Sequence, residues 1–374
     1  PKSDFEYWLQ ALGFDLGNPF ENVEADQERA FLPECFVEVD GYETIKGNKT
    51  VIAFAERGGG KSTLRIELAN QLAPISFSST ILAVECTDFG LLVARKRSSG
   101  ILTIEDLVYF LLHRGVQILL CMFSSDPTLQ EFIPETVSLR QQRDVRASRL
   151  PIPSRIRLAQ LIRNYYPSLV NPESLYSRIR SLENNFAPSL REFNDAVTSQ
   201  RLRELLTNTC ENFGGTLELL ADLIDYSEFV KDKNITPREQ LLSFLEVVHD
   251  AELDRVHFLL DRLDEQQETA DDPKAQVDII EPLLADLTIL EMQGVTFKFF
   301  LPRETRDIAL SRSTVRRDRL TDYAITVEWG RDLLKQLLDK RLLIYSNRQV
   351  HSLSPLCKNI SINVRGETLE LDTW

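Results

Sequence analysis

Residues 51–63 read VIAFAERGGGKST, and this stretch decides the fold class of the chain. Its first five residues form an uninterrupted apolar run, as expected of a parallel strand that is covered on both faces. Leu64, Leu68 and Leu72 then recur at helical spacing, which predicts a helix over 62–73 that ends before Pro74. A glycine-rich turn between a buried strand and a helix is typical of a phosphate-binding loop.

The loop contains the residue types that polyphosphate binding requires. Backbone N–H groups must turn inward around the anion, and glycines allow both that conformation and a close approach. A helix N-terminus facing the anion, a lysine for the outer phosphates and a hydroxyl for Mg²⁺ complete such a site. We therefore expect Lys61 to meet the β- and γ-phosphates and Ser62 to bind Mg²⁺. The expected nucleotide contacts are Arg57, Gly58, Gly59, Gly60, Lys61, Ser62 and Thr63.

One position departs from the pattern G-x-x-x-x-G-K-[ST]. Ala55 stands in place of the first glycine. Alanine is the smallest replacement and the position ends the predicted strand, so we expect the change to be tolerated. The alternative is a flexible glycine turn in which the lysine occurs by chance.

A second apolar run, at 256–260, ends in the sequence DRLDE at 261–265. A carboxylate that ends a strand beside the phosphate loop can hold Mg²⁺ through water, and a nearby acid can orient the attacking water. Asp261 is therefore the expected metal ligand. Because Arg262 occupies the next position, the general base would be Glu265 or Asp264. The alternative is a solvated acidic loop after a core strand.

Three further segments have strand-like composition, at 80–87, 295–301 and 323–329, and helical patterns separate the strands. Strands that alternate with helices predict an α/β fold with a three-layer, mainly parallel sheet. The long segment between the second and third strands has mostly helical patterns. Leucines at helical spacing also predict an amphipathic helix over 331–345.

Together these motifs resemble the P-loop ATPases of the STAND and AAA+ groups, in their prokaryotic NACHT-like or origin-recognition-like forms. The residues that carry the resemblance are the G-x-G-K-S/T loop and the D-x-h-D-E strand end at 261–265. The resemblance implies five strands in the order 5-1-4-3-2 and a helical lid. It also implies ATP and Mg²⁺ as ligands, with slow or partner-stimulated hydrolysis of ATP to ADP and phosphate.

The same resemblance assigns roles outside the two motifs. Arg303 follows the fourth strand at the sensor 1 position, where STAND proteins often have arginine. Arg316, Arg317 and Arg319 lie where AAA+ proteins carry the arginine finger, which reaches the γ-phosphate of a neighbouring subunit; a guanidinium suits that task. A solvated basic helix end is the alternative for these three. Phe20 lies in a segment similar to the linker that covers the adenine, and would either stack on the base or dock without touching it.

The domain organisation follows from these assignments. We expect the last segment, 331–374, either to start a helical lid that diverges from the usual one or to end before such a lid is complete. The expected parts are an N-terminal linker region at 1–49, the ATPase core at 50–125 and 250–330, a helical insertion at 126–249, and the start of the lid or a C-terminal segment at 331–374.

Charge bears on the partners of the chain. The net charge of −14 disfavours nucleic acid as a default partner. A local reversal occurs between Arg140 and Arg163, where seven arginines accompany one acid, Asp144. This segment would contact nucleic acid, an acidic partner or an adjacent subunit, or else would pair within the chain or be solvated. No apolar run suits a membrane span and no signal peptide is recognisable, so we expect a cytoplasmic protein without a membrane partner.

Three functions are compatible with the sequence. The first is an ATP-gated oligomerisation switch in signalling or anti-phage defence, which assembles as a homo-oligomer through the ATP site and acts through an effector protein. The second is a DNA-associated AAA+-type ATPase, motivated by the Arg140–Arg163 segment. The third is a nucleotide-binding scaffold with decayed hydrolysis, motivated by Ala55 and Arg262.

Overall fold

The computed structural model describes residues 31–72, 80–123, 235–352, 361–364 and 367–370, and the isolated positions 10, 13, 14, 18, 19, 25, 27–29, 161 and 165. The predictions for Phe20, for the arginines from Arg140 to Arg163 and for most of the helical insertion at 126–249 lie outside these residues.

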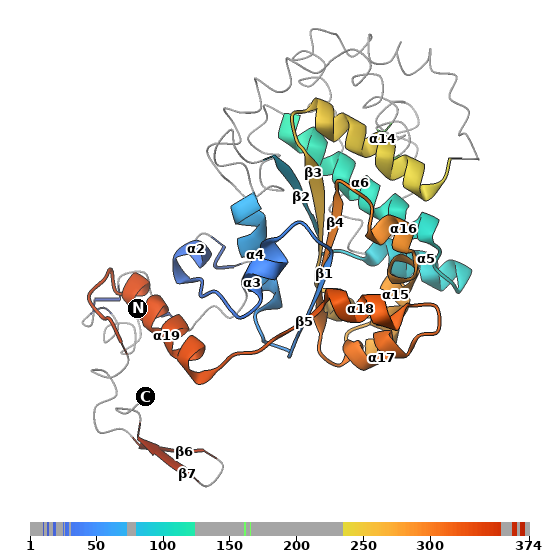
Figure 1. Cartoon of the computed structure of the whole chain (residues 1–374). Coiled ribbons are helices and arrows are strands. Elements are labelled where there is room, and N and C mark those ends of the chain that lie inside the picture. The colour runs from blue at the N-terminus through green and yellow to red at the C-terminus, as the bar shows by residue number, and fades with distance from the viewer. Residues whose placement is uncertain are drawn as a thin grey trace, which may run out of the picture.

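A five-stranded sheet forms the centre of the described structure, and all of its strand pairs are parallel (Figure 1). Its order is β2-β3-β4-β1-β5, which is 5-1-4-3-2 when read from the β5 edge. The structure is therefore an α/β fold with a parallel sheet. The strands are β1 (Val51–Ala55), β2 (Ile81–Cys86), β3 (Arg255–Leu260), β4 (Val295–Pro302) and β5 (Ala324–Val327).

The apolar runs of the sequence correspond to the interior strands. β1 and β4 are buried along their whole length, and β3 is buried after its first residue. The last strand is shorter than the predicted 323–329. Tyr323 ends helix α18 (Arg317–Tyr323), where its hydroxyl donates a hydrogen bond of 2.6 Å to Glu291, and Trp329 lies beyond the strand. The alternation around β5 thus reflects a half-buried edge strand and not a longer one.

Helices cover both faces of the sheet, as a three-layer architecture requires (Figure 1). Along β3, Val256, Phe258 and Leu260 belong to one core, whereas Leu259 belongs to the other. The larger core packs against α5 (Gly90–Ser99), α6 (Ile104–Phe123), α14 (Pro237–Asp250), α15 (Pro273–Ala285), α16 (Leu287–Leu290) and α17 (Thr305–Ser311). The smaller one packs against α3 (Tyr42–Lys46) and α4 (Lys61–Leu72), near the short α2 (Leu32–Cys35).

Helices stand at both ends of the long segment between β2 and β3. α6 enters it and α14 leaves it, and the two helices pack against each other. α14 begins with a capping box, in which the Thr236 hydroxyl accepts from the Glu239 N–H and the Glu239 carboxylate accepts from the Thr236 N–H. The described ends of this segment are therefore helical, and they continue the core of the sheet domain.

The C-terminal part contains both a helix and a hairpin. α19 (Arg331–Tyr345) has the bounds that the leucine pattern predicts. β6 (Ser361–Val364) and β7 (Glu367–Glu370) pair antiparallel in a separate two-stranded sheet. Within the described part of 331–374, the helix α19 is followed by a β-hairpin. A lid made only of helices would not account for this part.

Candidate functional site

The carboxyl ends of four strands bring the candidate residues together at one edge of the sheet. The glycine loop follows β1, Asp261 follows β3, Arg303 follows β4 and Trp329 follows β5. The Arg303 N–H donates to the Ala55 carbonyl oxygen at 2.9 Å, which holds the ends of β4 and β1 side by side. The carboxyl edge of a parallel sheet is where α/β folds bind ligands, so this edge is the candidate site.

Each of the three glycines in the loop has its own physical reason to be glycine. Gly58 and Gly60 have φ values of +76° and +77°, in the left-handed region that other residues adopt at a cost. At Gly59 a Cβ atom would lie 2.8 Å from the Glu56 carbonyl oxygen, which is closer than any side chain allows. The Gly59 N–H donates to the same oxygen at 2.9 Å. The loop therefore makes a tight turn that leads directly into the N-terminus of α4.

Ala55 fits its position without a glycine. It is an ordinary strand residue, 1% exposed, in register with Pro302 of β4 and Val327 of β5. The turn begins only after it, at Glu56. The departure from the motif pattern thus falls where the backbone remains regular β-strand.

The two sequence motifs meet through a lysine and an acid. The Lys61 Nζ lies 3.5 Å from Oδ2 of Asp264, and both side chains are largely buried. Asp264 lies in a short 3₁₀ turn, η2 (Leu263–Glu265), that follows β3. Residues some 200 positions apart in the chain are therefore direct neighbours, as the phosphate-loop interpretation predicts.

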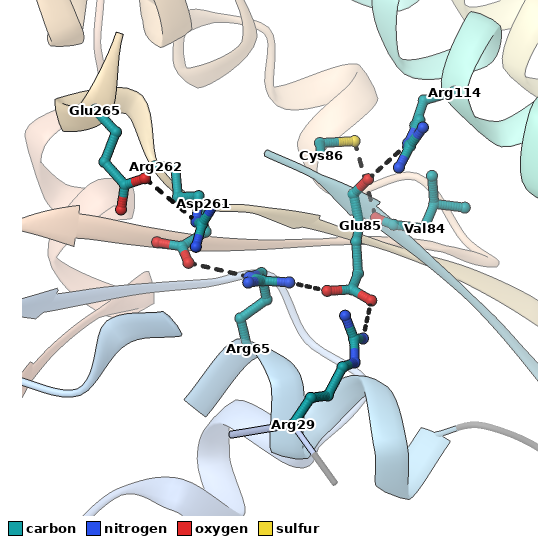
Figure 2. A network of polar contacts seen from close by, with 9 residues as sticks. All are labelled: Arg29, Arg65, Val84, Glu85, Cys86, Arg114, Asp261, Arg262 and Glu265. Carbon is teal, nitrogen blue, oxygen red and sulfur yellow. Dashed lines mark hydrogen bonds and ion pairs between the residues drawn. The ribbon is translucent and has the colours of Figure 1, made fainter. Parts of the chain in front are cut away.

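Asp261 is held in a buried network of charges (Figure 2). It is 1% exposed, and its Oδ2 accepts a hydrogen bond of 3.0 Å from Nε of Arg65 on α4. Arg65 also donates to Glu85 on β2, and Glu85 accepts from Arg29 of the N-terminal segment. Two carboxylates and two guanidinium groups thus compensate each other where unpaired charges would be strongly unfavourable.

The second oxygen of Asp261 has a different environment. Its Oδ1 is buried and has no hydrogen-bond partner among the described residues. A buried carboxylate oxygen without a donor is unfavourable unless a ligand or water supplies one. Arg65 therefore takes up one oxygen of Asp261 and leaves the other without a donor.

Few side chains at this edge could ligate a metal. No group of three or more His, Cys, Asp or Glu side chains in the described part of the chain could hold a metal by itself. Mg²⁺ at nucleotide sites is bound by one or two protein oxygens, with phosphate and water supplying the others. Asp261 and Ser62 fit this limited role.

The two candidate bases have different surroundings. Asp264 lies against Lys61, whereas Glu265 is half-exposed, with its Oε2 3.4 Å from Nε of Arg262 (Figure 2). Arg262 itself has a φ of +68°, a left-handed conformation that turns the chain sharply after Asp261. This turn directs Asp264 to the loop and Glu265 toward solvent.

Of the expected arginines, the structure brings one to the loop. Nη1 of Arg303 lies 3.0 Å from Oε1 of Glu56, the first residue of the turn, and 3.6 Å from Glu328 after β5. Arg316, the N-cap residue of α18, pairs with Asp318 at 2.7 Å, and Arg319 within the helix pairs with Glu291 at 3.9 Å, while Arg317 is exposed. Within the described residues none of these three has a hydrogen bond or ion pair to the loop.

The participants that were not predicted from the sequence include Arg29, Arg65 and Glu85 of the charge network, and Trp329, whose indole N–H donates to the Gly59 carbonyl oxygen. Arg65 lies beside Leu64 and Leu68 on the buried side of its helix, and Glu85 interrupts the apolar run of β2. A charge within an apolar pattern was the available signal in both cases. Cys86, next to Glu85, is not a nucleophile candidate, because burial raises the pKa of its thiol to about 12.

Comparison with known proteins found no matching family model, curated protein or solved structure. No helix in the described ranges combines the length and the apolar character that crossing a membrane demands.

Proposed function

We propose that the chain is a P-loop ATPase of the STAND/AAA+ type that binds Mg²⁺·ATP at residues 55–63 and hydrolyses it slowly. One observation carries the proposal. A tight glycine turn, a buried lysine and two strand-end carboxylates, Asp261 and Asp264, meet at the carboxyl edge of a parallel sheet. Each feature is common by itself, but the combination is what binding of a metal–triphosphate complex requires.

The chain's residues would divide the work as follows. The N–H groups of the turn and the N-terminus of α4 surround the phosphates. Lys61 exchanges its contact with Asp264 for the β- and γ-phosphate oxygens, and Asp261 and Ser62 hold the metal. When bound, Mg²⁺ neutralises developing charge on the phosphates. Asp264, freed from Lys61, or Glu265 then accepts a proton from the attacking water.

Nucleotide binding and turnover under matched conditions test the proposal. For Lys61→Ala we expect loss of ATP binding and at least a 100-fold fall in turnover, since a charge-assisted phosphate contact is lost. Lys274→Ala, at an exposed position in the first turn of α15, is the control and should behave like the wild type. A wild-type protein that neither binds nor hydrolyses ATP would contradict the proposal.

The two candidate bases are separated by Asp264→Asn and Glu265→Gln. The variant that lacks the base should still bind ATP but turn it over at least 100-fold more slowly. Because Asp264 also neutralises Lys61, Asp264→Asn is expected to strengthen ATP binding, whereas Glu265→Gln should leave binding unchanged. Retention of turnover in both variants would show that neither carboxylate acts as the base.

A second candidate function is a nucleotide-binding scaffold without hydrolysis. It is favoured by the cations beside the acids: Arg65 on Asp261, Lys61 on Asp264 and Arg262 on Glu265. ATP binding that is lost in Lys61→Ala, with no turnover in the wild type, would support it.

ATP-driven assembly is the regulatory part of the proposal. Arg316, the N-cap residue of α18, and Arg317 and Arg319 within that helix are exposed, so they are accessible to a neighbouring subunit. The assembly would act in signalling or anti-phage defence. We expect mass photometry to show a larger species with Mg²⁺·ATP, lost in Arg319→Ala. A protein that remains monomeric with ATP would exclude the switch.

For the DNA-associated alternative, salt-dependent DNA binding should disappear when the arginines from Arg140 to Arg163 are neutralised.

A further inference from the structure

We infer that Trp329 is a positioning residue of the phosphate loop, whose indole fixes the Gly59–Gly60 peptide so that the Gly60 N–H is presented to phosphate. The inference deepens the proposed function and rests on it.

The contact joins a side chain after β5 to the backbone of the loop. Nε1 of Trp329 donates a hydrogen bond of 3.0 Å to the Gly59 carbonyl oxygen. The ring covers the next residue as well, because a Cβ atom placed on Gly60 would lie 3.3 Å from Cζ2 of Trp329. The indole therefore engages two successive residues, one through a hydrogen bond and one through its ring.

The geometry of the peptide gives this contact its consequence. In a planar trans peptide the C=O and the following N–H point in opposite directions. An indole that binds the Gly59 oxygen therefore fixes the Gly60 N–H so that it points away from the indole. Among the described residues that N–H has no hydrogen-bond acceptor, whereas the Gly59 N–H is already bound to Glu56. The Gly60 donor is thus oriented and available for an anion.

The sheet register explains why this side chain reaches the loop. β5 lies parallel to β1, with Val327 opposite Ala55. Trp329 is two residues past Val327, so it lies beside the first turn of the loop. Gly330 then caps the N-terminus of α19. A single tryptophan therefore connects the phosphate loop to the start of the C-terminal helix.

A flexible glycine turn needs such a contact. Glycine residues sample positive and negative φ readily, so an unsupported turn loses conformational entropy when it binds phosphate. A loop already held in the binding conformation avoids that cost, and its affinity is correspondingly higher. The indole also packs against Gly60 and so restricts this residue further.

The test compares Trp329→Phe, which keeps a ring and removes the N–H, with Tyr323→Phe. This control removes the hydrogen bond from the Tyr323 hydroxyl to Glu291. Tyr323 directly precedes β5, the strand that Trp329 follows. For Trp329→Phe we expect the dissociation constants for ATP and ADP to rise about five- to tenfold, as loss of one hydrogen bond predicts. The KM for ATP should rise similarly and kcat should change less than twofold, because the Gly60 N–H that the indole positions would contact bound substrate and transition state alike.

The outcomes separate this inference from the proposed function. If the wild type binds ATP, Lys61→Ala does not and Trp329→Phe binds like the wild type, the inference is wrong and the function stands. A fall in ligand-free thermal stability without a change in affinity or KM would show that Trp329 only packs, which also overturns it. A wild type that binds no ATP overturns both.

Fluorescence gives an independent measurement on the unaltered residue. The chain has three tryptophans, Trp8, Trp329 and Trp374, so Trp8→Phe with Trp374→Phe leaves Trp329 as the sole indole. Mg²⁺·ATP should change its emission, and Lys61→Ala should abolish the change. An emission that stays constant while ATP binds would contradict the contact between this indole and the nucleotide-binding loop.

Discussion

At the scale of single residues, the buried pair of Arg65 and Asp261 matters most for the site. Both side chains are at most 2% exposed, and Arg65 also compensates Glu85. Replacing one partner of a buried pair leaves an uncompensated charge, which costs about 3–5 kcal/mol. We therefore expect Arg65→Met to lower the free energy of unfolding by about that amount, measured by urea denaturation.

The control for this prediction is an ion pair of the same chemistry on the surface. Arg95 lies 2.9 Å from Asp106 but is largely exposed, so Arg95→Met should cost no more than about 1 kcal/mol. Adding Asp261→Asn to Arg65→Met should recover part of the loss, because Asp261 is the carboxylate left without a counter-charge, whereas Glu85 keeps Arg29. Equal effects of Arg65→Met and Arg95→Met would show that burial does not govern the pair.

Lys298 predicts a pH dependence of stability. The residue is 1% exposed, its ammonium group donates to the carbonyl oxygens of Gly47 and Lys49, and burial lowers its pKa to about 7. Between pH 7 and 10 the unfolded chain holds this proton while the folded chain has lost it, so stability rises with pH and falls as pH drops toward 7.

Lys298→Met should remove this dependence. The free energy of unfolding of the wild type, minus that of the variant, should rise between pH 7 and 9 by at most about 1.4 kcal/mol per pH unit, the limit for one proton. Urea denaturation at several pH values measures the difference. A difference that stays constant would mean that the buried ammonium keeps its proton throughout.

At the scale of elements, strands and helices with strong patterns were predictable. The apolar run predicted the bounds of β1, because a strand that is covered on both faces is apolar throughout. The leucine repeat predicted the bounds of α19, because a helix that packs through one face repeats its apolar residues at helical spacing. The end of β5 was not predictable, because Tyr323 and Trp329 alternate like strand residues but are used by α18 and by the loop. Sequence periodicity records which side chains are buried and not which partner buries them.

The same limit applies within the candidate site. The positions of Gly58, Lys61 and Asp261 after the ends of β1 and β3 were predictable, since they follow from the local sequence around a strand end. Arg65 and Trp329 were not, because their roles arise from neighbours on other strands that the sequence does not identify.

The start of α14 gives a prediction at the element scale. Hydrogen bonds from the Thr236 backbone and hydroxyl lower the pKa of Glu239, as its place in the capping box requires. Thr236→Ala removes the cap and should cost about 1 kcal/mol in the free energy of unfolding. Thr236→Ser keeps the hydroxyl and is the control. If the two variants have equal stability, the cap does not contribute.

At the scale of the whole molecule, two adjacent residues of the N-terminal segment connect distant parts. Glu28 accepts hydrogen bonds of 2.6 and 2.7 Å from Arg341 and Tyr345 on α19, while Arg29 donates to Glu85 in the network of Asp261. The segment before the sheet is thus fixed to the C-terminal helix on one side and to the candidate site on the other. Trp329, two residues before the start of α19, contacts the site as well.

This arrangement predicts how α19 detaches. Glu28→Gln leaves the largely buried Arg341 without its counter-charge, and a hydrogen bond to a charged group contributes about 1.5–3 kcal/mol. Amide hydrogen exchange over 331–345 should therefore speed up about 10- to 100-fold, while β1 and β3, buried within the sheet, keep their protection. Asp318→Asn, in an exposed pair with Arg316, is the control and should change neither region. Equal loss of protection in α19 and the sheet would instead mean that the helix unfolds only together with the core, so that nucleotide could not move it independently.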